Sequence, residues 1–161
     1  MDIEEFGIPF FHNQKIWRVG ATMRLVSVQK RMAGGRRDVT VSSTGLFHLQ
    51  NMEEVPAQVP YPLGDIHSID DWASWSLGSA CAEARDALIE AMKVKSMDTS
   101  NLENQGLVRL VQHLGIDALQ RAEILNQPSL DRKQLALLER LELTRRLIEQ
   151  SPLENGTFFV N

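Results

Sequence analysis

Residues 15–49 read KIWRVGATMRLVSVQKRMAGGRRDVTVSSTGLFHL, and this stretch decides the N-terminal half of the fold. β-Branched and aromatic residues are frequent in 16–28 and again in 39–49, which favours strands over helices. Between these runs lie Gly34 and Gly35, which supply the positive φ angles that a tight chain reversal requires. The stretch therefore predicts one antiparallel β-hairpin over residues 15–49.

The first strand of this hairpin is predicted to be half-buried. Apolar residues occupy every second position from Trp17 to Leu25, and Arg18, Thr22 and Arg24 lie between them. Because successive side chains of a strand point to opposite faces, one face is apolar and the other is polar or basic. Two strands alone are marginal in water, so we expect the apolar face to pack on helices or on another subunit.

Charge divides the chain at about residue 50. Residues 1–50 contain 7 Lys and Arg against 4 Asp and Glu, a net charge of +3, whereas residues 51–161 contain 10 against 17, a net charge of −7. The total of −4 argues against a protein that coats nucleic acid with its whole surface. Four cations around the predicted turn are nevertheless candidate phosphate ligands: Lys30, Arg31, Arg36 and Arg37. A solvated edge, or contact with an acidic protein surface, is the favoured interpretation of these cations.

Residues 68–150 predict a bundle of about four helices. Four residues are predicted to cap helix N-termini, each just before an apolar run: Ser68, Ser100, Asp117 and Ser129. The first three are followed at the capping-box spacing by Asp71, Glu103 and Gln120. The longest helix, 130–150, is apolar on more than one side, because Leu135, Leu143 and Leu147 lie off its main leucine stripe. Either this helix is central in the domain or its second face meets a partner.

The remaining segments are apolar at both ends of the chain and proline-rich in the middle. Residues 1–14 are predicted to be an apolar arm, residues 50–67 an extended connector, and residues 151–161 a tail of strand composition. With 161 residues and 43% hydrophobic content, the chain is long enough to bury a core without metal or disulfide. We therefore expect a single α+β domain over 1–161, an N-terminal antiparallel hairpin followed by the helical bundle.

The sequence contains no motif that identifies a reaction, a cofactor or a metal. The segment 65–71 holds one histidine and three aspartates, but helix capping explains most of them better than a metal site does. Cys81 is surrounded by small residues and is read as a buried packing thiol. Residues 106–126 superficially resemble a helix-turn-helix, although ordinary helix packing is favoured. We accordingly expect no enzyme activity, no cofactor and no metal.

A cytoplasmic protein, or one that works in an assembly formed in the cytosol, is expected. One cysteine cannot form an internal disulfide, the first residues do not resemble a secretory signal, and no apolar run approaches the roughly 20 residues of a membrane span.

The surfaces indicate binding more than catalysis. We expect a non-enzymatic assembly or adaptor subunit that binds other protein chains, with self-association, as in a component of a larger homo- or hetero-oligomeric particle. The alternative is a nucleic-acid-binding or regulatory protein that uses the basic hairpin. The candidate protein-binding residues are apolar side chains near the ends of the chain and on the longest helix: Phe6, Phe10, Phe11, Leu143, Leu147, Phe158 and Phe159.

Overall fold

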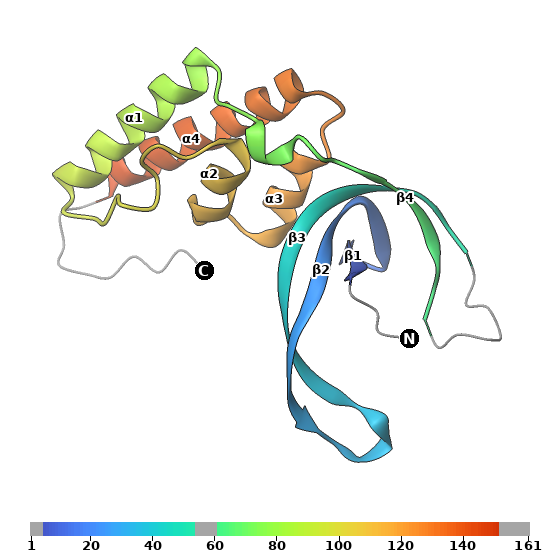
Figure 1. The fold of residues 1–161 in the computed structure, drawn as a ribbon. Helices are drawn as coiled ribbons and strands as arrows, with labels where there is room; N and C mark the ends of the chain where they lie inside the picture. Colours follow the sequence, from blue (N-terminus) through green and yellow to red (C-terminus); the bar gives the residue numbers. More distant parts are fainter. Residues whose placement is uncertain (1–4, 54–60, 152–161) are drawn as a thin grey trace. The chain divides into compact units, whose positions relative to one another are not determined.

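The structure is a computed structural model that describes residues 5–53 and 61–151, a β-sheet followed by helices (Figure 1). This order confirms the predicted α+β class. The chain divides into a sheet unit, Met1–Trp72, and a helical unit, Ala73–Asn161. The expectation of a single domain stays a prediction, since a division into units does not decide whether they fold together. No helix within the described ranges is both long and apolar enough to cross a bilayer.

The sheet unit is a four-stranded antiparallel meander, in which sequence order and spatial order agree. Its strands are β1 (Glu5–His12), β2 (Lys15–Arg31), β3 (Arg37–Met52) and β4 (Gly64–Ser68). The pairing of β2 with β3 confirms the predicted hairpin. Its turn contains Gly34 and Gly35 at φ angles of 77° and 79°, which glycine adopts without strain.

Two segments predicted to lack regular structure form strands. The prediction that the arm over 1–14 lacks regular structure is wrong for residues 5–12, because β1 pairs with β2 from Glu5 opposite Arg24 to His12 opposite Lys15. Pro9 is accommodated because β1 lies at the edge of the sheet and its register shifts between Pro9 and Phe11. The connector over 50–67 is also wrong at both ends, where β3 runs to residue 52 and β4 begins at residue 64.

One aromatic ring crosses the sheet and holds three strands together. Phe47 on β3 is only 1% exposed, and its ring lies over Gly20 of β2 and Gly7 of β1. A Cβ atom at Gly20 would overlap this ring and lie 2.8 Å from the carbonyl oxygen of Ile8, and one at Gly7 would lie 3.1 Å from Phe47 Cε1. The two glycines therefore form the floor on which the ring packs.

Up to residue 151, where its description ends, the helical unit contains four α-helices, in agreement with the predicted bundle: α1 (Ser79–Val94), α2 (Leu107–His113), α3 (Ala118–Leu125) and α4 (Leu130–Gln150). α1 and α4 are parallel, because contacts between them join residues 56 positions apart at both ends. Gly78 N donates to Gln134 Oε1 at 2.8 Å, and Lys95 Nζ donates to the carbonyl oxygen of Ser151 at 2.6 Å. The core includes leucines from all these helices except α3, which contributes Ile124: Leu88, Leu107, Leu110, Leu137 and Leu141.

Two of the four predicted helix caps are confirmed and two are wrong. Asp117 Oδ1 accepts from Gln120 N at 2.8 Å, and Ser129 Oγ accepts from Arg132 N at 3.3 Å. Ser68 instead ends β4, and α1 begins only at residue 79. The capping interpretation failed there because the segment pairs with β3.

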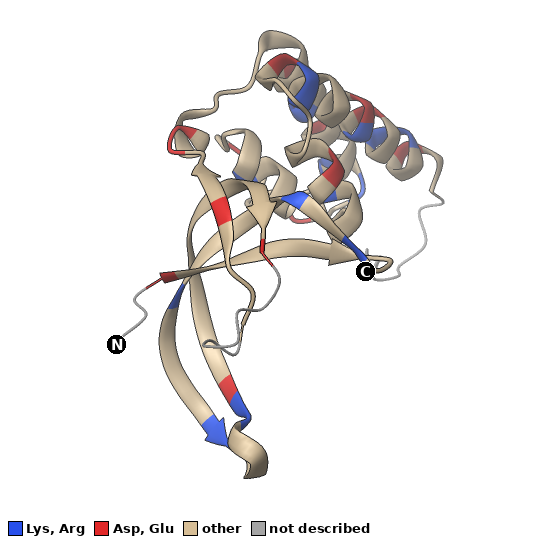
Figure 2. Ribbon diagram, turned by 90° about the vertical axis from the view of Figure 1, so that its right-hand side faces the viewer, with Lys and Arg blue, Asp and Glu red and all other residues tan. Residues whose placement is uncertain are grey.

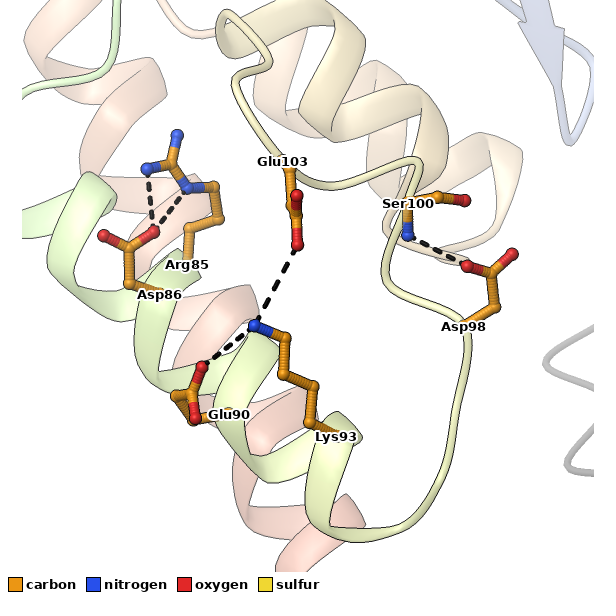
Figure 3. A network of polar contacts seen from close by, with 7 residues as sticks. All are labelled: Arg85, Asp86, Glu90, Lys93, Asp98, Ser100 and Glu103. Carbon is orange, nitrogen blue, oxygen red and sulfur yellow. Dashed lines mark hydrogen bonds and ion pairs between the residues drawn. The ribbon is translucent and has the colours of Figure 1, made fainter.

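The second failed cap, Ser100 with Glu103, lies in the loop that follows α1 (Figure 3). Ser100 N donates to Asp98 Oδ1 at 2.9 Å, a local turn that competes with helix capping and lowers the pKa of the Asp98 carboxyl. Glu103 lies 4.0 Å from Lys93, whose ammonium also contacts Glu90 at 3.1 Å. These are surface ion pairs, which contribute little to stability.

The glycine floor under Phe47 leads to a stability prediction. Gly20→Ala forces a methyl group against the buried ring and the backbone of β1, so we expect the free energy of unfolding to fall by about 1–3 kcal/mol. Urea denaturation followed by tryptophan fluorescence measures this loss. Ser42→Ala, at an exposed position of β3, is the control and should change stability by less than about 0.5 kcal/mol. Equal stability of the two variants would contradict the packing described here.

Candidate functional site

The two central strands of the sheet extend beyond their neighbours (Figure 1). β1 pairs with β2 as far as Arg24, and β4 pairs with β3 from Phe47 onward. Residues 25–41, here named the distal ribbon, consequently contain two strand segments that pair only with each other within the described sheet. Both outer edges of the ribbon are left without a neighbouring strand.

One face of the distal ribbon is apolar. Leu25 lies opposite Val41, and Val28 lies opposite Val39. Val39 and Val41 are two residues apart in a strand of unbroken register, so all four side chains share one face. Leu25 is 45% exposed and Val39 is 46% exposed. This apolar face of the ribbon is half open to solvent.

The opposite face of the ribbon is polar, and three of its side chains hydrogen-bond to one another. Ser27 lies opposite Thr40, and Lys30 lies opposite Asp38. Gln29 Nε2 donates to Ser27 Oγ at 2.8 Å and to Thr40 Oγ1 at 3.0 Å. Because Ser27, Gln29 and Thr40 already bond to one another, the apolar face is the side of the ribbon that gains most from contact with another molecule.

The structure brings the four predicted cations together at the tip of the ribbon, where Figure 2 shows basic segments with one acidic segment beside them. The turn is closed by Met32 N, which donates to the carbonyl oxygen of Arg36 at 2.9 Å. Arg31 lies directly opposite Arg37, and like charges in such a pair repel each other. Arg37 is two residues from Val39 on the same strand, so this cationic pair lies at the end of the apolar face.

The two outer edges of the ribbon differ in regularity. The register of β2 shifts between Leu25 and Ser27 and again between Val28 and Lys30. β3, in contrast, pairs through consecutive residues from Arg37 to Ser43. Bulges protect a strand edge against further pairing, whereas a regular edge offers its backbone N–H and C=O groups to an added strand. The outer edge of β3 is therefore the open edge of the ribbon.

The candidate phenylalanines near the N-terminus lie in β1. Phe10 is partly buried and meets the Trp17 ring edge-on, with 5.7 Å between ring centroids. Phe11 is 63% exposed and Phe6 is 36% exposed. Their predicted role in protein binding stays a prediction, as does that of Phe158 and Phe159, which lie outside the described residues.

The two candidate leucines of the long helix are exposed. Leu143 is 46% exposed and Leu147 is 59% exposed, on α4 in the helical unit. The structure thus places the described apolar candidates on two separate elements, β1 and α4, and brings the four tip cations together at the end of the ribbon.

The described residues hold no group of three or more His, Cys, Asp and Glu side chains arranged for a metal ion. Cys81 is buried, and its Sγ donates to the carbonyl oxygen of Gln134 at 3.1 Å. Burial raises the pKa of this thiol, which leaves it protonated and unreactive. Its environment agrees with the predicted packing role.

Sequence reasoning missed Lys133, a charged side chain buried in the helical unit. Lys133 is 3% exposed, and its Nζ donates to the carbonyl oxygens of Leu125, at 2.7 Å, and of Gln127. The ammonium also lies 5.4 Å from the centroid of the Trp75 ring. It therefore satisfies carbonyls at the end of α3 and ties that end to the first turns of α4. A lysine soon after a predicted helix end is a weak signal for such a contact.

Comparison with known proteins finds a similar fold but assigns no family. No protein-family model matches the sequence, and no curated protein matches it. Among solved structures, the chain is similar to the N-terminal domain of the Mycobacterium avium complex Lon protease, with a TM-score of 0.56 and 12% sequence identity. The similarity covers 85% of this chain and 76% of that one. At this identity the two chains share an architecture, and the similarity says nothing further about function.

The buried lysine leads to a matched pair of variants. Lys133→Met keeps the apolar stem but leaves two carbonyl oxygens unpaired, so we expect the free energy of unfolding to fall by about 1–3 kcal/mol. Arg132→Met, at the exposed neighbouring position, should change stability by less than about 0.5 kcal/mol. Urea denaturation at neutral pH separates the two. A Lys133→Met protein as stable as the wild type would show that the ammonium contributes no net stabilisation.

We also expect Lys133 to make the free energy of unfolding depend on pH. Burial lowers the pKa of Lys133 below its ordinary value of 10.5. Between the lowered pKa and 10.5 the unfolded chain therefore binds more protons than the folded chain, and stability rises with pH across this window. Denaturation series at increasing pH should show a gain in the wild type that Lys133→Met lacks. Parallel pH profiles for the two proteins would contradict the assignment.

Proposed function

We propose that this protein is a non-enzymatic assembly or adaptor subunit that binds other protein chains through its distal ribbon. The observation that carries the proposal is the amphipathic ribbon itself, which extends past both neighbouring strands with Leu25 and Val39 half exposed. A two-stranded ribbon is marginally stable in water, and a third strand or a covering surface stabilises it. Contact with another chain would both bury the apolar face and give hydrogen-bond partners to the backbone N–H and C=O groups of the open edge.

The open edge suggests how a partner would bind. An extended segment can add to the outer edge of β3 over residues 37–43, where backbone hydrogen bonds supply affinity. Alternate side chains of that segment would lie beside Val39 and Val41, which selects apolar residues at every second position. The cationic pair Arg31 and Arg37 at the end of this face selects acidic residues. The proposed partner is thus an extended segment that is both apolar and acidic.

The fold comparison is compatible with this proposal. The similar structure is a domain of a protease, an enzyme class that acts on polypeptides, although its 12% identity to this chain carries no function by itself. The absence of catalysis is likewise a proposal. It is supported by the buried, protonated Cys81 and by the lack of a metal-binding cluster among the described residues.

A nucleic-acid-binding or regulatory role is the second candidate, and the observation that favours it is the cluster of four tip cations. Lys30, Arg31, Arg36 and Arg37 are all exposed. Proteins that bind single strands usually add aromatic side chains on which bases stack, whereas the face beside these cations carries aliphatic residues. Aliphatic residues in this position suit a protein partner better.

A defined peptide tests the proposal. The probe is a fluorescein-labelled peptide of sequence Val–Thr–Val–Thr–Glu–Thr–Glu, here named the acidic peptide, which in an extended strand places its valines and its two glutamates on one face. We expect the full chain to bind it in fluorescence anisotropy, and the variant Val39→Ser/Val41→Ser to bind roughly tenfold more weakly or worse, because the buried apolar contact is lost. Thr40→Ser, on the polar face, keeps a hydroxyl for Gln29 and is the matched control with unchanged affinity.

Two further probes separate the candidate functions. A peptide with lysine in place of both glutamates should bind more weakly than the acidic peptide, since its charges meet the cationic pair Arg31 and Arg37. A labelled oligodeoxynucleotide of twelve thymidines should not bind. If the oligonucleotide binds with steep salt dependence while neither peptide binds, the nucleic-acid role replaces the protein-binding role.

A further inference from the structure

α4 is a two-faced helix. On one side Leu137 and Leu141 are fully buried, at 0% exposure, and Gln134 contacts the start of α1. On the other side Leu135, Leu143 and Leu147 are 47%, 46% and 59% exposed. At about 100° per residue, the exposed leucines span an arc of about 120° that is centred opposite the buried side. We name this arc, with the residues between its leucines, the outer stripe of α4.

The outer stripe carries one acidic and one basic residue among its leucines. Glu139 and Arg146 lie within the arc, seven residues or about two helical turns apart. Both side chains are exposed. Arg146 contacts Glu142 at 3.2 Å, a pair of exposed groups on the same helix that exchanges readily. For Glu139 no ion pair is found within the described ranges, so its carboxylate is available to a partner.

This arrangement is self-complementary. If two such helices pair antiparallel around a two-fold axis between positions 142 and 143, each Glu139 faces the other helix's position 146. The two Leu143 side chains then meet beside the axis, where their exposed surface is buried. A parallel pairing would instead set Glu139 against Glu139 and Arg146 against Arg146, which repel. The charges therefore select the antiparallel arrangement.

We propose that the outer stripe of α4 binds the outer stripe of a second copy of this chain, antiparallel, with two reciprocal ion pairs between Glu139 and the partner's Arg146. A closed two-fold interface uses the same patch on both subunits, and a stripe with an acid and a base on either side of a central leucine meets that requirement. The proposal names a partner and a surface that the protein-binding role of the distal ribbon does not involve, and neither depends on the other.

Charge exchange tests the pairing. Sedimentation velocity over a concentration series should show a monomer–dimer equilibrium for the full chain. Glu139→Arg and Arg146→Glu should each weaken dimerisation roughly tenfold or more, because symmetry places two like-charged pairs in the interface. The double variant Glu139→Arg/Arg146→Glu reverses both charges and should restore the wild-type dissociation constant to within about threefold.

Three controls make the result specific. Glu83→Arg changes an exposed acid on α1 and should leave dimerisation unchanged. Leu143→Ser should abolish the dimer while its thermal melt stays close to that of the wild-type monomer. Val39→Ser/Val41→Ser should dimerise normally, because the ribbon is not part of this interface.

Each alternative outcome overturns the proposal. If the wild-type chain stays monomeric up to millimolar concentration, the proposed interface does not form. If the double variant does not recover dimerisation, the ion pairs between Glu139 and the partner's Arg146 do not form. A dimer that is lost in the ribbon variant and retained in Leu143→Ser would assign self-association to the ribbon.

Discussion

The unequal lengths of the four strands constrain the rest of the sheet unit. β2 and β3 contain 17 and 16 residues, whereas β1 and β4 contain 8 and 5. Where strands overlap, Phe47 crosses two glycines and forms a buried core. Beyond that overlap the two long strands have no neighbour in the described sheet, so their apolar face and outer edges stay open. The same mismatch that limits the core creates the candidate binding surface.

Much of this architecture could be predicted from local sequence. Gly34 and Gly35 between β-branched runs located the hairpin, and Ser129 before a periodic leucine run located α4. β1 and β4 were missed because prolines interrupt or precede these edge strands, and their pairing with distant residues leaves little local signal. Lys133 was missed because burial depends on how helices pack, which a lysine in a helical pattern does not reveal.

The candidate site, too, could be predicted from the sequence only in part. The four tip cations are neighbours of the turn in sequence, so their clustering followed from the hairpin alone. The apolar face could not be predicted from the hairpin alone, because simple alternation from Trp17 places Leu25 and Val28 on opposite faces of the strand. The register shift between Leu25 and Ser27 changes this alternation and brings Val28 to the same face as Leu25. Such a shift depends on pairing across the hairpin and has no signature in either strand separately.

The two proposed surfaces have different chemistry, which suits a subunit that links copies of itself to another protein. The distal ribbon combines an open backbone edge with aliphatic side chains and a cationic tip, and this combination favours an extended acidic segment. The outer stripe of α4 combines leucines with one acid and one base, and this combination favours an identical helix.

Hydrogen–deuterium exchange along β3 tests the central claim most directly. In an edge strand every second amide bonds to the neighbouring strand and the others face outward. In the free chain, the outward amides of residues 37–43 should exchange quickly while the alternate amides, bonded to β2, exchange slowly. The acidic peptide at saturating concentration should then protect the outward amides. Unchanged exchange in 37–43, with protection confined to β1 or to the helical unit, would contradict the account.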